Sequence, residues 1–275
     1  MSTLNLRPVA SSSSSSTSKP IPSPSLLKPW DFSYSPSPDG KDVNLMIMFH
    51  GLGDTKAPFF NLAKQLNLPS TAILSLSAPD PIPLMDHPSF SWYSTFTPQF
   101  DPLPISSQNP TKPLPALRSL LSTLTSKEIG WKLESIHLFG WGQGGTVALE
   151  LGLDIGKRPL TEQDREGGKR FGSIVSVCAG LLTHPTSDLK IATAVLWFNR
   201  LAPSSAAHQK TISILKRAYR EVQSVQGQQQ GSNANVEAMP RGKEEWWGIM
   251  KFWGQLLGRA DEGWKGQGEV YEVVR

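Results

Sequence analysis

Cysteine is almost absent from the sequence: the 275 residues include a single one, Cys178. A single cysteine excludes a disulfide within the chain and is compatible with a reducing compartment. No apolar run approaches the roughly 18 residues needed to span a bilayer, and the first residues lack the apolar segment of a secretory signal. We therefore expect a cytoplasmic protein without a transmembrane segment.

Neither sign of charge dominates the composition. The chain has 27 Lys and Arg residues against 23 Asp and Glu residues, which gives a formal net charge of +4 and a pI near 9.1. This excess is mild and dispersed, whereas nucleic-acid and membrane-surface proteins concentrate their basic residues in patches. We expect no nucleic-acid partner. With 38% hydrophobic residues, the chain is long enough to bury one substantial core.

Large apolar side chains are scarce at the beginning of the sequence, which contains SSSSSSTSKPIPSPS (residues 11–25). Such a composition cannot offset the entropy of ordering the chain. We predict a disordered tail over residues 1–38 and one folded domain over residues 39–275. The serines, Arg7 and the lack of an acidic residue before Asp31 faintly resemble a mitochondrial transit peptide, but no amphipathic basic helix is present.

Three further stretches interrupt the domain. Residues 156–170 and 223–238 are polar and resemble surface insertions. Residues 97–115 are rich in proline, so we predict a long excursion that holds neither a helix nor a central strand.

Between these stretches, short apolar runs alternate with helical patterns. The runs are typical of strands buried on both faces of a parallel sheet: VNLMIMF (43–49), TAILSLS (71–77), SIHLFG (135–140), SIVSVCAG (173–180) and ATAVLWF (192–198). Helical periodicity covers residues 59–66, 116–124 and 146–153, and a longer helix is predicted to carry Ile212, Leu215, Tyr219 and Val222 on one face. The alternation predicts an α/β fold with helices on both faces of the sheet, and a ligand site at the carboxyl ends of the strands.

Two glycine-rich motifs follow predicted strands at that edge. They are FHGLGDT (49–55) and GWGQGG (140–145). In this order they resemble the phospholipase/carboxylesterase family of α/β-hydrolases, which includes acyl-protein thioesterases and lysophospholipases. SAPDPIP (77–83), the Trp92-Tyr93 pair and the closing segment EEWWGIMKFWGQLLG (244–258) extend the resemblance, which covers roughly residues 43–259. It implies the α/β-hydrolase fold, a mostly parallel sheet with helices on both faces.

The family hydrolyses carboxylic esters and thioesters with a serine, which a histidine deprotonates and an aspartate orients. The resemblance places Gly142 at the serine position, and glycine has no side chain to form an acyl intermediate. The aspartate position falls in NRLAPSS (199–205), at Pro203, and the histidine position falls in MPRGKEEWW (239–247), at Lys243. No histidine follows His208 in the sequence. All three residues of the triad are thus replaced.

Four other residues are candidates for the missing groups. Thr146 lies a helical turn beyond the motif, where its hydroxyl would point into helix packing. Lys243 as a base would still lack a nucleophile to deprotonate. We expect His208 to be an exposed helical residue, with a relocated base as the alternative. Cys178 lies within a predicted buried strand, where a free cysteine usually packs as a small hydrophobe.

The resemblance implies that an oxyanion hole persists, formed by the backbone N–H groups of Leu52 and Gln143. The residues that would support the two motifs are His50, Gly51, Gly53, Asp54, Gly140 and Gly144. In the family the histidine at the position of His50 supports the loop and is not the histidine that deprotonates the serine. The alternative is that these glycines persist because they allow close strand-to-helix packing.

Tryptophans in the closing segment offer one lead toward a protein partner. One helical stripe carries Trp246, Ile249, Met250, Trp253 and Leu257. Trp247 is displaced from this stripe by about 100°. We expect the stripe to be core and Trp247 to be half-buried, with an apolar patch toward a partner as the alternative.

Two functions stay open from the sequence. The favoured one is a non-catalytic member of the family that retains an acyl pocket for a fatty-acyl or other hydrophobic ligand. We expect this cleft beside Leu52, Gly142 and Gln143, roofed by residues 97–115, and we expect no metal or other cofactor. The alternative is an active carboxylesterase or acyl-protein thioesterase that uses another nucleophile or a water held by the oxyanion hole.

Overall fold

The computed structural model describes residues 5–8, 18–161, 170–228, 237–260 and 271–274. A seven-stranded sheet forms its centre, with the strand order β10-β9-β8-β7-β3-β4-β2. Its strands are β2 (Phe32–Ser35), β3 (Asn44–Phe49), β4 (Thr71–Leu76), β7 (Ile136–Trp141), β8 (Ser173–Val177), β9 (Ala194–Asn199) and β10 (Val222–Gln226). All neighbours pair in parallel except β2, which is antiparallel to β4. Two small antiparallel sheets pair β5 (Asp80–Pro81) with β6 (Phe90–Ser91), and β1 (Asn5–Pro8) with β11 (Tyr271–Val274).

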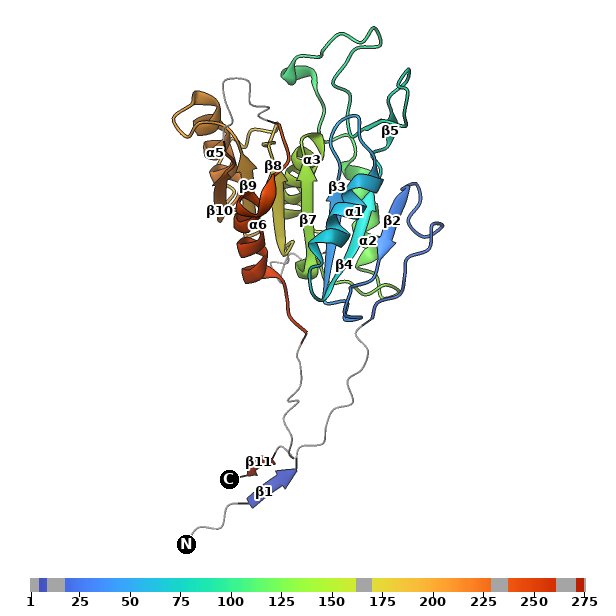
Figure 1. The fold of residues 1–275 in the computed structure, drawn as a ribbon, viewed down its shortest axis with the longest axis vertical. Coiled ribbons are helices and arrows are strands. Elements are labelled where there is room, and N and C mark those ends of the chain that lie inside the picture. The colour runs from blue at the N-terminus through green and yellow to red at the C-terminus, as the bar shows by residue number, and fades with distance from the viewer. Residues whose placement is uncertain (1–4, 9–17, 162–169, 229–236, 261–270, 275) are drawn as a thin grey trace.

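Helices cover both faces of the main sheet (Figure 1). They are α1 (Lys56–Leu66), α2 (Leu114–Leu124), α3 (Gln143–Lys157), α5 (Ala206–Ala218) and α6 (Gly242–Leu256), with short 3₁₀ turns η1 (Ile105–Ser107) and η2 (Leu133–Ser135). The apolar sides of α2, α3 and α5 pack into one core cluster, and those of α1 and α6 pack into a second cluster on the other face. The structure confirms the predicted α/β fold with a mostly parallel sheet.

The five predicted buried strands correspond to β3, β4, β7, β8 and β9, and nearly every residue in them is buried. The predicted long helix is only partly correct. α5 ends at Ala218, Tyr219 is the extended residue that caps it, and Val222 begins β10. Tyr219 is buried as expected, but its hydroxyl donates to the carbonyl of Leu149 on α3. A buried side chain continued the helical pattern although the backbone had already left the helix.

Two segments expected outside the regular structure are partly regular. β10 begins the polar stretch 223–238 and pairs with β9, so this stretch opens with an edge strand. Residues 97–115 contain η1, and α2 begins at Leu114 with a proline in its first turn. Proline is tolerated there because the first helical N–H groups have no intrahelical acceptor.

The prediction of a disordered tail through residue 38 is wrong for residues 18–38. Leu27 and Trp30 are buried in the core, and β2 pairs with β4. The Trp30 ring lies 6.1 Å from that of Trp92. Distant segments supply the apolar surface on which these side chains pack. Local composition alone could therefore not reveal that residues 18–38 are folded. Residues 1–4 and 9–17 of the predicted tail lie outside the described residues.

Candidate functional site

The second glycine motif forms a sharp turn between β7 and α3. Gly142 is the N-cap of α3 and has φ 53° and ψ −122°, a backbone conformation that is rare for residues with a side chain. Its N–H donates to the Val177 carbonyl at 3.1 Å, and its carbonyl accepts from Thr146 N–H at 3.1 Å. An added Cβ would have one neighbour within 4 Å, the Cα of Gly51 at 4.0 Å. The turn therefore has the backbone and the room for a side chain, and glycine supplies none.

The flanking glycines are required by close packing. A Cβ on Gly140 would lie 2.3 Å from the carbonyl oxygen of Gly144. A Cβ on Gly144 would lie 2.4 Å from the carbonyl oxygens of both Phe49 and His50. These contacts are to backbone atoms, which have little freedom to move. The packing explanation for these two glycines is confirmed.

The first motif follows β3 and lies against this turn. Gly51 faces Trp141, because a Cβ on Gly51 would approach the indole ring to 2.6 Å. Gly53 has φ 80° and donates its N–H to the Phe90 carbonyl at 2.9 Å. The carboxylate of Asp54 accepts from the N–H of Thr55 at 2.7 Å. These bonds fix the conformation of the loop beside the elbow.

His50 is fully buried in this loop and acts as a structural hydrogen-bonding group. Its Nε2 accepts from the N–H of Ala78 at 2.9 Å, so the proton is on Nδ1, which donates to the Gly51 carbonyl at 2.7 Å. Burial lowers the pKa of His50 and keeps the ring neutral. Trp92 Nε1 donates to the His50 carbonyl at 2.8 Å. His50 therefore connects two loops, as the family resemblance implies.

Gln143 follows the elbow and uses its side chain to anchor a third loop. Its Oε1 accepts from Trp92 N–H at 3.0 Å, and its Nε2 donates to the Tyr93 carbonyl at 2.9 Å. Leu52 keeps 38% of its surface exposed. Within the described part of the chain, the backbone N–H groups of Leu52 and Gln143 have no hydrogen-bond acceptor. The other described residues therefore use neither of these two donors.

Other polar groups on α3 are used in packing. The Thr146 hydroxyl donates to the Gly180 carbonyl at 3.0 Å, which confirms that it points into the fold. Glu150 is buried, and its Oε1 accepts from the N–H groups of Leu182 and Thr183 at 3.0 and 2.8 Å. Burial raises the pKa of Glu150, although these hydrogen bonds oppose the rise.

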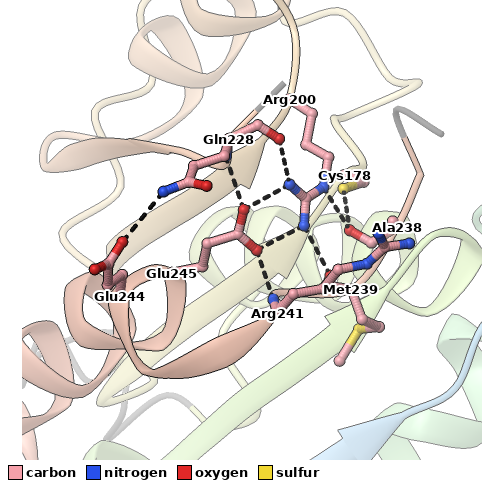
Figure 2. Close-up of polar contacts among 8 residues, drawn as sticks. All are labelled: Cys178, Arg200, Gln228, Ala238, Met239, Arg241, Glu244 and Glu245. Atoms are coloured by element: carbon pink, nitrogen blue, oxygen red, sulfur yellow. Dashed lines mark hydrogen bonds and ion pairs between the residues drawn. The ribbon is translucent and has the colours of Figure 1, made fainter. Parts of the chain in front are cut away.

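The positions assigned to the acid and the base are both at the surface. Pro203 is exposed in the segment between β9 and α5, and Lys243 is exposed in the first turn of α6. A buried ion pair that sequence reasoning missed joins these two segments. Arg200 Nη1 and Nη2 donate to the two carboxylate oxygens of Glu245 at 2.6 Å each, with side-chain exposures of 5% and 7% (Figure 2).

Hydrogen bonds keep this pair ionised. Burial opposes ionisation of Glu245, but donors on Arg200, Arg241 and Gln228 outweigh it and lower the pKa of the carboxyl. The hydrogen bonds to Glu245 likewise raise the pKa of Arg200. One signal in the sequence was available, since Glu245 lies on the same helical stripe as Ile249 and Trp253, where a charge needs a partner.

Three other residues differ from expectation. Cys178 comes directly after β8, where it is half-buried at φ 58°, and burial raises the pKa of its thiol to about 12. His208 is buried, so the expectation of an exposed residue is wrong. Its ring lies 5.1 Å from that of Trp197, because it continues the inward stripe of Ile212 and Leu215 on α5. Trp247, expected to be half-buried, is 70% exposed.

Apolar groups and a cavity adjoin the first motif. An open cavity of about 610 Å³ is lined by Gly53, Asp54, Thr55 and residues 85–89. Its lining includes neither Gly142 nor Gln143, and no residue of the predicted roof, 97–115. Large exposed apolar side chains lie in the first motif (Leu52) and in the chain between β4 and α2: Leu84, Met85, Phe96, Phe100 and Ile105. No helix within the described residues is long and apolar enough to cross a membrane.

Comparison with known proteins identifies the family. Residues 35–161 match the phospholipase/carboxylesterase family. An uncharacterized hydrolase of Mycosarcoma maydis is 34% identical over 251 residues, which cover 88% of this chain and 87% of that protein. The chain belongs to the phospholipase/carboxylesterase family of α/β-hydrolases. An uncharacterized hydrolase of Schizosaccharomyces pombe is 32% identical over 152 residues, which cover 54% of this chain and 61% of that protein.

Solved structures of other proteins share the fold of this chain. The crystal structure of esterase PE8 has a TM-score of 0.62 at 14% identity and covers 83% of this chain and 99% of its own. That of Zea mays acyl-protein thioesterase 2 has a TM-score of 0.56 at 18% identity, with the same coverage of both chains. At such identities the likeness concerns the fold alone.

Proposed function

We propose that this chain is a non-catalytic member of the phospholipase/carboxylesterase family. The observation that carries the proposal is Gly142, which holds the strained backbone of a nucleophile elbow and has no side chain. A covalent ester hydrolase needs a nucleophile at the point where the strand meets the helix. The elbow has kept its shape, and the group that would attack a carbonyl carbon is missing.

The positions of the acid and the base support the same proposal. Pro203 and Lys243 have no carboxylate and no imidazole, and both face solvent. The neighbouring charges, Arg200 and Glu245, neutralise each other and are fully engaged in hydrogen bonds. A guanidinium paired in this way cannot accept a proton, and the Glu245 carboxylate already accepts four hydrogen bonds from three residues. Neither group is available as a general base.

The retained donors support binding of an acyl ligand. The backbone N–H groups of Leu52 and Gln143 match the oxyanion donors of the family, and the exposed apolar side chains of Leu52 and Met85 lie at the first motif. We therefore propose a fatty-acyl or similar hydrophobic ligand with a carbonyl or carboxylate group. Saturable binding of a fatty acid or an acyl thioester in isothermal titration calorimetry is the expected result. Absence of binding would leave the motifs with a purely structural role.

Steady-state hydrolysis of a p-nitrophenyl ester tests the proposal. Serine hydrolases that lack their triad retain roughly 10³–10⁴-fold acceleration over water, so only weak turnover is expected. The alternative is an active carboxylesterase or thioesterase that uses another nucleophile or a held water. Robust turnover, abolished by changing one side chain, would establish that alternative and reject the proposal.

A further inference from the structure

Residues 237–239, which we call the strap, precede α6 and lie along the carboxyl edge of three neighbouring strands. Trp141 ends β7, Cys178 follows β8 and Arg200 follows β9. All three side chains donate to backbone carbonyls of the strap, in order along the edge. Trp141 Nε1 donates to Glu237, and Cys178 Sγ donates to Ala238 at 3.4 Å. Arg200 Nε donates to Ala238 at 3.3 Å, and Arg200 Nη2 donates to Met239 at 2.9 Å. The strap has no helix or strand of its own.

Arg200 is the main side chain that holds the strap. Its guanidinium donates two bonds to the strap, two to Glu245 on α6, and one to the Gln228 carbonyl at 2.8 Å (Figure 2). An arginine side chain has five N–H donors, and bonds to the described residues engage all five of them. A single residue thereby ties the end of β9 to the strap, to the segment after β10 and to α6.

The strap covers a floor that adjoins the elbow. Cys178 follows Val177, whose carbonyl accepts the N–H of Gly142. Trp141 directly precedes Gly142, and Trp141, Cys178 and Met239 each pack against the same core cluster. Trp141 and Cys178 are both partly buried, and withdrawal of the strap would expose more of the indole and the thiol beside Gly142.

We propose that Arg200 is a latch that holds the strap closed over this floor and thereby controls access to the side of the elbow. The latch does not depend on whether the protein catalyses a reaction. Its consequence for ligand entry rests on the proposed function, because the ligand would bind at the same elbow. Arg200 is thus a positioning residue that acts through the strap.

Cys178 is a direct reporter of the closed state, because it is the only cysteine in the chain. A thiol must ionise to react, and an exposed cysteine thiol has a pKa of about 8.5. Burial raises the pKa of the half-buried Cys178 thiol, so a much smaller fraction of it is ionised. In the full-length native protein, Arg200→Met should raise the rate of Cys178 labelling by N-ethylmaleimide at least about tenfold.

Arg118→Met is the matched control. Arg118 on α2 also forms an ion pair, with Asp154 on α3 at 2.7 Å, and its hydrogen bonds go to Asp154, Arg158 and Pro159 and not to the strap. We expect this variant to label at the wild-type rate even where its melting temperature falls. Thermal melts of all variants separate opening of the strap from global unfolding.

Arg200→Lys keeps the charge but loses the planar fork that reaches several acceptors at once. It should melt closer to the wild type than Arg200→Met and still label faster than the wild type. It also serves as the test if Arg200→Met fails to fold. The proposal is overturned if wild-type Cys178 labels as fast as in urea, if both Arg200 variants label at the wild-type rate, or if labelling follows only the loss of global stability. Robust ester turnover would overturn the proposed function and leave the labelling result intact.

Discussion

At the scale of single residues, Gly142 has two consequences that follow from one missing side chain. Under the proposed function it removes the nucleophile, and it relieves a backbone conformation with φ 53° that costs a residue with a Cβ about 1–3 kcal/mol. A serine would fit, since one backbone atom lies within 4 Å of an added Cβ. Restoring the nucleophile is therefore a question of chemistry and strain, not of space.

Gly142→Ser should fold, lose about 1–3 kcal/mol of stability and show no efficient esterase activity, because no base lies ready to deprotonate the hydroxyl. Gly142→Ala is the control, with the same strain and no hydroxyl. The triple change Gly142→Ser, Pro203→Asp and Lys243→His should exceed the single variant on one activated ester. Efficient turnover by Gly142→Ser alone would show that a working base is present.

Glu245→Gln should destabilise the protein by about 3–5 kcal/mol at pH 7, because it removes the buried carboxylate that pairs with the Arg200 guanidinium. The pKa of Glu245 is lowered on folding, so its contribution is complete above its ordinary value of 4.5 and is lost as the pH falls through the lowered value. Urea unfolding of both proteins from pH 7 to pH 3 measures this. A gap that stays constant over the whole range would contradict the assignment.

At the scale of elements, apolar patterning revealed the interior and missed the edges of the sheet. The five central strands are buried on both faces, so their sequences are continuous apolar runs. β2 and β10 lie at the two edges and carry mixed sequences, FSYS and VQSVQ, that resemble loops. Their pairing depends on neighbours far away in the chain, which local patterns do not report.

The candidate site divides in the same way. The glycines and His50 could be found because their motifs are contiguous and each has a local backbone reason. The pair of Arg200 and Glu245 joins residues 45 positions apart, and the fold must exist before they meet. Sequence reasoning could therefore locate the two motifs but not the buried ion pair.

The contact between α3 and β3 can be tested by adding one methyl group. Gly144→Ala should destabilise the protein severely, since its Cβ would lie 2.4 Å from two backbone oxygens on the strand side. Gly254→Ala on α6 is the matched control, because no atom lies within 4 Å of its added Cβ and alanine favours a helix by about 1 kcal/mol. Thermal melts that show equal effects would contradict the packing explanation for Gly144.

At the scale of the whole molecule, the folded domain begins earlier than composition suggests. Trp30 contacts Trp92 and donates its indole N–H to the Ala116 carbonyl at 3.4 Å. The segment that leads into β2 therefore covers the core beneath the loops of the candidate site. A domain cut at residue 39 would lose this cover and the edge strand.

Trp30→Ala should lower the free energy of unfolding by about 3–5 kcal/mol, as expected for a buried tryptophan. Trp247→Ala provides the comparison, since its side chain is 70% exposed and the change should stay within about 0.5 kcal/mol. Chemical denaturation of the two variants gives both values. A small effect at Trp30 would mean that residues 18–38 are not part of the cooperative unit.

The central claim is that a hydrolase fold presents no activated nucleophile at its elbow. The most direct test is to incubate the native wild-type protein with a fluorophosphonate, which reacts covalently with an activated serine, and to measure the intact mass. We expect the mass of the unmodified chain. A stoichiometric adduct on one residue at the carboxyl edge of the sheet would contradict the account and identify the protein as an enzyme.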